Sequence, residues 1–208
     1  ASTSGCVVSK ANIKSNLVKT VNRFLIGVQV VVLIMAFSEF VSAEITYVEN
    51  VYTLISQLKQ QPTTSEIVRI AEEIGPIVDE VRKSKIDVGE LKKLASLLKK
   101  MRELTQQRVM DLERESGQNE ASLERLYRSQ SYDDLSFSQA AFAYWRAWID
   151  LELARRIGNE SIKNRTLITA LNGFRVASMQ LFRLGLVYGG WLGIGYVEME
   201  LGNHDRAR

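Results

Sequence analysis

The sequence predicts an all-α fold. Only two prolines, Pro62 and Pro76, interrupt 208 residues, and Leu, Glu, Arg, Ala and Lys, which favour helices, are abundant. Apolar residues also recur at spacings of three and four over long stretches, as on one face of a helix. We therefore expect a chain of successive helices.

Residues 1–23 form a basic segment without Asp or Glu, and the basic residues are Lys10, Lys14, Lys19 and Arg23. This composition is typical of the downstream end of an organellar transit peptide, or of a basic flank. The first residue is Ala1 rather than Met, so we expect a processed or trimmed product. A basic leader and a flexible tail are both open interpretations of this segment.

Residues 24–61 are predicted to be a membrane anchor helix followed by a stalk. The run from Phe24 to Phe37 has Gln29 as its one polar residue. A full span needs about 20 residues, and we expect the anchor to extend through residues 24–41. Helical spacing of apolar residues then continues to position 61 without Gly or Pro.

Two alternatives to an uncleaved anchor remain. Val41, Ser42 and Ala43 are suited to signal-peptidase cleavage, which would release a bacterial periplasmic or envelope protein cut after Ala43. The same apolar run could also be a buried core helix, because runs of 10–14 apolar residues occur in both settings.

Residues 62–116 are predicted to form an antiparallel helical hairpin. Thr63 and Glu66 have the spacing of a capping box, and Asp87 begins the second helix in the same way. Gly75 and Pro76 should kink or split the first helix, since proline cannot donate to the preceding turn. The apolar stripes are Ile67, Ile70, Ile74, Ile77 and Val81 in the first helix, and Leu91, Leu94, Leu98, Met101 and Leu104 in the second.

Residues 131–208 are predicted to be stacked helices. Breaks are expected at 116–119 and at 131–134, where Ser, Asn, Gly and Asp gather, and a turn is expected at 157–159. A helix from Asn164 to about Leu184 should follow that turn.

The C-terminal stretch 189–208 resembles a tetratricopeptide repeat. Trp191, Ile194 and Gly195 match the opening W-x-x-L-G of that family with Ile in place of Leu, and 201–203 supplies the turn. Ala207 falls at the small position of the second helix. The resemblance implies that Gly195 and Ala207 let two helices approach, while Trp191 fills the gap against a neighbouring repeat.

The match departs from the family pattern in two places. Glu198 stands where the family prefers tyrosine, and the sequence stops at Arg208, so the last repeat is cut short. Trp148 and the turn at 157–159 echo Trp191 and the turn at 201–203 at a separation of 43–44 residues, against about 34 in the family. The first repeat is therefore expected to be irregular.

The resemblance implies a partner-binding groove, because the first helix of each repeat in this family lines a concave surface. Aromatic and Arg anchors suit such a surface. In the alternative interpretation, the tryptophans are packing core. The candidate groove residues are Trp145, Trp148, Glu152, Arg155, Leu192, Tyr196 and Met199.

Other function classes lack their chemistry. Residues 1–43 hold four of the 27 basic and one of the 24 acidic residues, so 23 of each remain and no basic surface for nucleic acid is expected. Cys6 and His204 are the only residues of their types, which disfavours thiolate metal sites and histidine-based catalysis. We predict no catalytic residue, cofactor or metal. Gly185, Gly189 and Gly193 imitate a membrane helix-packing motif, but we assign them to the repeat.

The sequence thus predicts a single-pass membrane protein that binds other proteins and is not an enzyme. A basic leader, one anchor and tetratricopeptide repeats together are similar to the thylakoid-anchored family that assists photosystem I assembly. That resemblance implies a chloroplast thylakoid location; the alternative is a bacterial inner membrane or periplasm.

Overall fold

The computed structural model describes residues 62–84, 86–117, 119–180 and 184–207, together with Glu49, Val51, Thr53 and Ser56. All regular structure in these residues is helical, which confirms the all-α class. The predicted leader 1–23 and anchor 24–41 lie outside them. The helices are α2 (Thr64–Lys83), α3 (Val88–Glu115), α4 (Glu120–Tyr127), α5 (Gln130–Arg156), α6 (Glu160–Ser178) and α7 (Leu184–Glu200).

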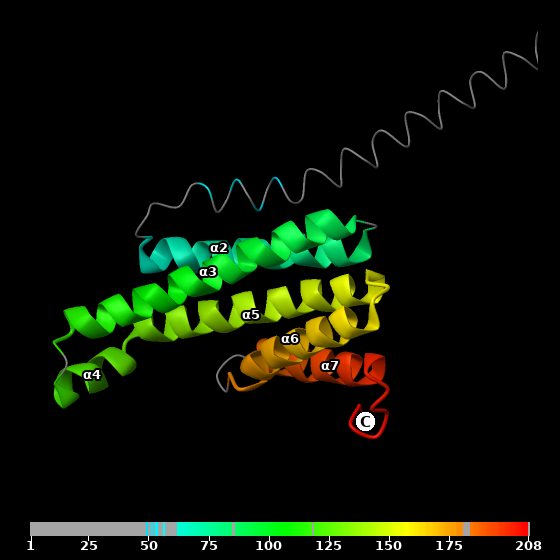
Figure 1. The fold of residues 1–208 in the computed structure, drawn as a ribbon. Coiled ribbons are helices and arrows are strands. Elements are labelled where there is room, and N and C mark those ends of the chain that lie inside the picture. Colours follow the sequence, from blue (N-terminus) through cyan, green and yellow to red (C-terminus); the bar gives the residue numbers. More distant parts are fainter. Residues whose placement is uncertain are drawn as a thin grey trace, which may run out of the picture. The chain divides into compact units, whose positions relative to one another are not determined.

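The long helix α5 lies at the centre of this arrangement. It packs against α2 and α3 on one side and against α6 on the other, and it also reaches α7, which packs mainly on α6. Figure 1 shows that α5, α6 and α7 run in alternating directions, as do α2 and α3. None of the described helices has the length and hydropathy needed to cross a membrane.

Side-chain caps decide where the helices begin. The Thr63 hydroxyl accepts from the Glu66 amide at 3.3 Å, and the Thr63 amide donates to the Glu66 carboxylate at 2.7 Å, which confirms the predicted capping box. Asp87 caps α3 as expected by accepting from two backbone amides. Asn119, Ser129 and Asn159 cap α4, α5 and α6 in the same manner.

The predicted apolar stripes of α2 and α3 belong to one core with α5, against which both helices pack. Ile77 and Leu104 are only partly buried, whereas the other stripe residues are buried. Val51 also belongs to this core and is completely covered. Burial of each such side chain stabilises the fold by about 1.5–3 kcal/mol. Apolar residues at spacings of three and four share one helix face, so the spacing identified these buried residues correctly.

Helix α2 continues through Gly75 and Pro76, so the predicted split is wrong. Pro76 is exposed, and the carbonyl that loses its helical donor belongs to Glu72, an exposed residue one turn earlier. Water can satisfy that carbonyl. Residues on both sides of the proline, such as Ile74 and Val78, are buried in the core, which favours a continuous helix here.

The predicted break at 131–134 is also wrong, because these residues form the first turn of α5. The chain reverses slightly earlier, and Ser129 caps the helix. Ser and Asp favour both loops and first turns, since their side chains and charge complement the free amides of a helix N-terminus. The short helix α4, which precedes this turn, was not predicted.

Helix α6 starts at Glu160 and ends at Ser178, earlier at both ends than expected. Asn159 closes the turn after α5 and caps α6 at the same time, with its side chain accepting from the Ile162 amide at 3.1 Å. Met179, expected inside the helix, follows it and is highly exposed. The predicted turns at 157–159 and 201–203 are present, the latter with Gly202 at φ +78°.

Candidate functional site

The candidate groove residues of α5 share one face of that helix. Trp145, Trp148, Glu152 and Arg155 follow each other at spacings of three and four, which places them in one row. Helix α5, which carries this row, contacts both α2 and α7. We call the row and the adjoining surface of α7 the α5–α7 face.

Trp148 is the point at which four helices meet. Its side chain is only 2% exposed. The Arg82 guanidinium of α2 lies 3.4 Å from the centre of its ring system, while Phe174 of α6 and Tyr196 of α7 meet it edge-on with centroid distances of 4.9 and 5.9 Å. Such contacts add to the energy of burial. Trp148 therefore positions the α5–α7 face from beneath.

Trp145 has a different environment, one turn earlier on α5. It is half-buried, and its indole lies against Gly75 of α2. Its ring also meets that of Tyr144 edge-on at 4.7 Å. Trp145 forms one wall of a cavity of about 540 Å³ between α2 and α5, so it stays accessible to a bound group.

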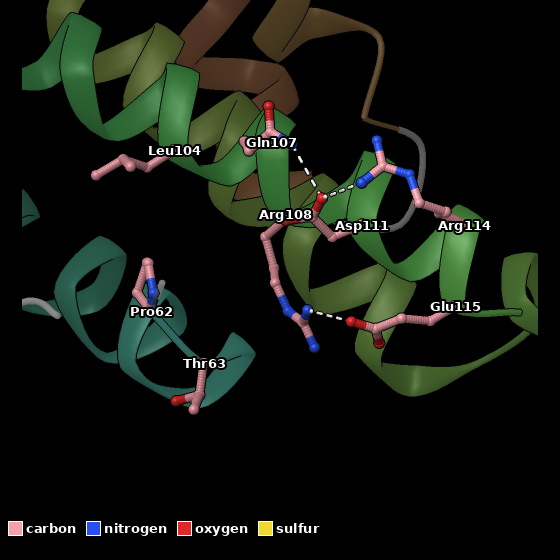
Figure 2. A pocket seen from close by; sticks show the side chains of 8 residues that line it. All are labelled: Pro62, Thr63, Leu104, Gln107, Arg108, Asp111, Arg114 and Glu115. Carbon is pink, nitrogen blue, oxygen red and sulfur yellow. Dashed lines mark hydrogen bonds and ion pairs between the residues drawn. The ribbon is translucent and has the colours of Figure 1, made fainter. Parts of the chain in front are cut away.

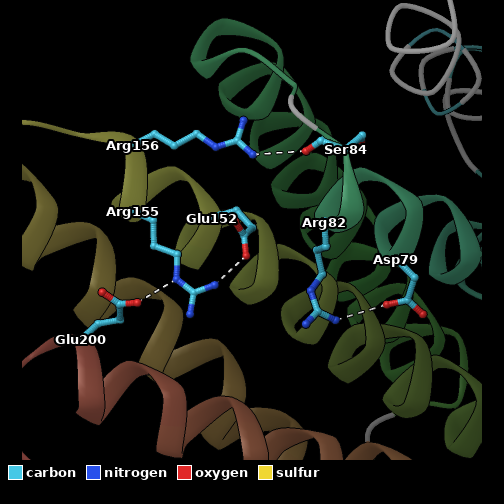
Figure 3. Close-up of polar contacts among 7 residues, drawn as sticks. All are labelled: Asp79, Arg82, Ser84, Glu152, Arg155, Arg156 and Glu200. Atoms are coloured by element: carbon cyan, nitrogen blue, oxygen red, sulfur yellow. Dashed lines mark hydrogen bonds and ion pairs between the residues drawn. The ribbon is translucent and has the colours of Figure 1, made fainter. Parts of the chain in front are cut away.

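Arg155 links the end of α5 to the end of α7. Its Nε donates to Glu200 at 2.8 Å and its Nη1 donates to Glu152 at 2.9 Å (Figure 3). Burial disfavours its charge, but the hydrogen bonds and charges of these carboxylates outweigh burial and raise the pKa of Arg155. The guanidinium also lies 5.9 Å from the Tyr196 ring centre. The bridge to Glu200 joins α7 to α5, and the bridge to Glu152, within α5, orients the guanidinium.

A second contact closes the same end of the bundle. Arg156 donates to the Ser84 carbonyl at 3.4 Å, at the C-terminus of α2 (Figure 3). Its positive charge there complements the helix dipole. Two neighbouring arginines of α5 thus fix this end of the bundle.

The α7 part of the face is apolar and open. Leu192, Tyr196 and Met199 lie on one side of the helix, and their exposed fractions are 57, 39 and 53%. Tyr188 belongs to the same stripe and is also exposed. Since Tyr196 touches Trp148 and Arg155, this stripe borders the α5 row.

The structure therefore brings the candidate residues together in two ways. Trp148, Arg155 and Tyr196 are in direct contact, whereas Leu192 and Met199 join them through the surface of α7. Sequence reasoning missed Tyr188, although it lies one turn before Leu192, and it missed Arg82, whose position over Trp148 no local pattern indicates.

Trp191 does not pack against another described helix. Its side chain is 61% exposed, so the expectation that it fills a gap against a neighbouring helix is wrong for the described residues. Gly195 does approach the segment after α7, since a side chain there would meet the Ala207 carbonyl at 3.5 Å.

A second cavity, of about 400 Å³, lies between the start of α2 and the end of α3 (Figure 2). Its cations are paired: Arg108 with Glu115 at 3.0 Å and Arg114 with Asp111 at 3.5 Å. Because a carboxylate neutralises each arginine, the electrostatic potential in this cavity gives an anion little attraction. Within the described ranges no group of His, Cys, Asp and Glu could hold a metal ion.

Comparisons with protein-family models, curated proteins and solved structures find no match to this chain. The tetratricopeptide resemblance therefore rests on the residues quoted above, from Trp191 to Ala207.

Proposed function

We propose that this chain is a membrane-anchored scaffold or assembly factor that binds other proteins through the α5–α7 face. The observation that carries the proposal is the exposed apolar stripe of Leu192, Tyr196 and Met199 beside the Arg155 ion pairs. Large apolar side chains gathered on one exposed helix face are typical of interaction sites. Tyr and Arg are the residue types that most often dominate binding energy.

The chemistry of this face suits a polypeptide segment. Leu192 and Met199 offer apolar area, worth about 25 cal/mol per Å² removed from water, and the flexible Met side chain adapts to different shapes. Arg155 and its carboxylates lie at the rim, where charges favour orientation over affinity. Trp148 and the bridges beneath keep the face rigid, which reduces the ordering cost of binding.

Membrane attachment through residues 24–41 is the second half of the proposal, and it rests on the apolar run of the sequence. We expect the membrane fraction to retain the protein through a high-salt wash, and deletion of residues 1–43 to release it. Retention of the deletion variant would contradict a sole anchor there. An intact mass beginning at Glu44 would instead support the released envelope protein.

The narrower proposal, a role in photosystem I assembly at the thylakoid, rests on the family resemblance alone. It predicts that photosystem I subunits or their assembly intermediates are captured by the α5–α7 face in thylakoid membranes. Capture restricted to unrelated proteins would leave the scaffold proposal standing without this assignment.

Site-specific photocrosslinking tests the binding face. A benzoylphenylalanine placed at Leu192 or Met199 in the full chain should give the same discrete adduct in native membranes. The matched control is Met110 of α3, which is exposed to a similar degree, 43% against 53% for Met199. Equal adducts from position 110, or none from positions 192 and 199, would contradict the proposal.

A further inference from the structure

The cavity between α2 and α5 is distinct from the α7 stripe and has an apolar interior. Pro76 and Leu186 contribute walls, and Phe137, Ala141 and Trp145 line it from α5. At about 540 Å³ it lies within the range of small ligand sites. It can therefore take one or two large side chains.

Small residues of α2 keep this cavity open. A Cβ atom on Gly75 would come within 2.8 Å of the Trp145 ring, closer than atoms approach without a shift. Because position 75 is glycine, the indole can approach the backbone of α2 closely. Trp145 thus forms a hydrophobic wall without filling the space beside it.

The rim of the cavity is acidic. Among the described residues that line it, Glu72, Asp79 and Glu80 are acidic and Lys83 is the one cation. Asp79 is bonded to Arg82 at 3.3 Å, and Glu80 to Lys83 at 2.7 Å in a solvent-exposed pair. In the part of the chain that the structure describes, Glu72 forms neither a hydrogen bond nor an ion pair.

Glu72 also presents a second acceptor. Pro76 has no N–H, so the Glu72 carbonyl lacks its normal helical donor. The exposed residue Glu72 therefore brings a carboxylate, and a backbone carbonyl without a helical donor, to the edge of an apolar cavity. This combination suits an ammonium or guanidinium group, which only donates hydrogen bonds. Phosphate-bearing ligands would be repelled by the rim.

We infer that this cavity binds a basic amphipathic segment of a partner protein. One large apolar side chain enters beside Trp145, and a Lys or Arg of the same segment pairs with Glu72. The inference rests on the proposed scaffold function and adds the chemical class of the partner. Charge complementarity selects a basic segment, while the apolar interior supplies most of the affinity.

The experiment compares two adjacent charge reversals in the full chain. Glu72 and Glu73 are both exposed residues of α2, but only Glu72 lines the cavity. The probes are a fluorescein-labelled helical peptide of leucine and lysine and its leucine–glutamate counterpart, followed by fluorescence anisotropy. Both variants have the same net charge. Binding of the peptide to detergent, or to the rest of the protein surface, is therefore the same for both and does not affect the difference between them.

We expect Glu72→Lys to weaken binding of the leucine–lysine peptide about tenfold, as reversal of a close partly screened charge should. Glu73→Lys should change it less than about twofold. Equal effects of the two reversals, or preference of the native chain for the leucine–glutamate peptide, would overturn the inference.

A benzoylphenylalanine at Leu186 supplies an independent readout, since this half-buried residue lines the cavity from α7. It should crosslink the leucine–lysine peptide in the native chain and lose the adduct in Glu72→Lys. If the adducts from Leu192 and Met199 persist while this one fails, the scaffold function stands and the basic-segment inference falls.

Discussion

Asp150 is a carboxylate inside the helical core. Asp150 is 5% exposed. Its carboxylate forms an ion pair with Arg146, whose Nε lies 3.3 Å from Oδ2 of Asp150. Burial raises the pKa of Asp150 to about 6, and the Arg146 charge offsets this only in part. The folded protein thus binds a proton here at a pH where the unfolded chain has released it.

This difference predicts a pH dependence of stability. Between pH about 4 and about 6 the folded state holds more protons than the unfolded state, so the free energy of unfolding should fall as pH rises, and it should level off above about 6. Asp150→Asn should remove that fall, which is worth about 3 kcal/mol for a shift of about two pKa units. Chemical unfolding at several pH values measures it.

The matched control is Asp205→Asn, the same change at an exposed position after α7. The free energy of unfolding of this variant should depend on pH in the same way as that of the native chain. A profile for Asp150→Asn that runs parallel to the native one between pH 4 and 6 would show that Asp150 does not titrate in this way.

At the scale of elements, the glycines of α7 let it pack closely on its neighbours. A side chain on Gly190 would collide with the backbone of Ser178, and one on Gly193 would overlap the Phe174 ring. A side chain on Gly189 would likewise collide with the Tyr144 hydroxyl, whereas one on Gly185 would enter open space. Two of the three glycines spaced by four thus serve helix packing within this chain.

These contacts predict opposite effects of the same substitution on one helix. Gly193→Ala should destabilise the protein by about 1–3 kcal/mol, because the ring of the fully buried Phe174 has no free space to move into. Gly185→Ala should be neutral or stabilising by up to about 1 kcal/mol, since alanine has the higher helix propensity. Denaturant unfolding of both variants provides the comparison, and equal losses would contradict this packing.

At the scale of the whole molecule, α5 connects the α2–α3 pair to α6 and α7. Thirteen of its residues are buried, whereas the short helix α4 buries none. A helix that contacts the five other described helices opens only when the rest of the structure opens, while one without buried side chains can fray alone.

Hydrogen exchange followed by mass spectrometry should therefore rank the described helices. We expect the amides of α5 to exchange most slowly and those of α4 to exchange fastest, by several orders of magnitude. Exchange of α2 and α3 as quickly as α4 would indicate that they form a separate, weaker unit and that the Arg82–Trp148 contact does not couple the two halves.

The sequence by itself determined the features that depend on local chemistry. Helical spacing of apolar residues predicted the cores of α2 and α3, and Thr63 and Asp87 predicted their starts. The turns at 157–159 and 201–203 and the shared face of Leu192, Tyr196 and Met199 were predictable for the same reason: neighbours in the sequence fix caps, turns and faces.

Only the tertiary structure decided features that depend on residues far apart in the chain. The continuity of α2 through Pro76, the exposure of Trp191 and the position of Arg82 over Trp148 all follow from which helices pack together. Helix α5 illustrates the reason: it is buried on several sides, so its sequence has no single apolar stripe from which its partners could be read. Packing between distant helices leaves no local pattern.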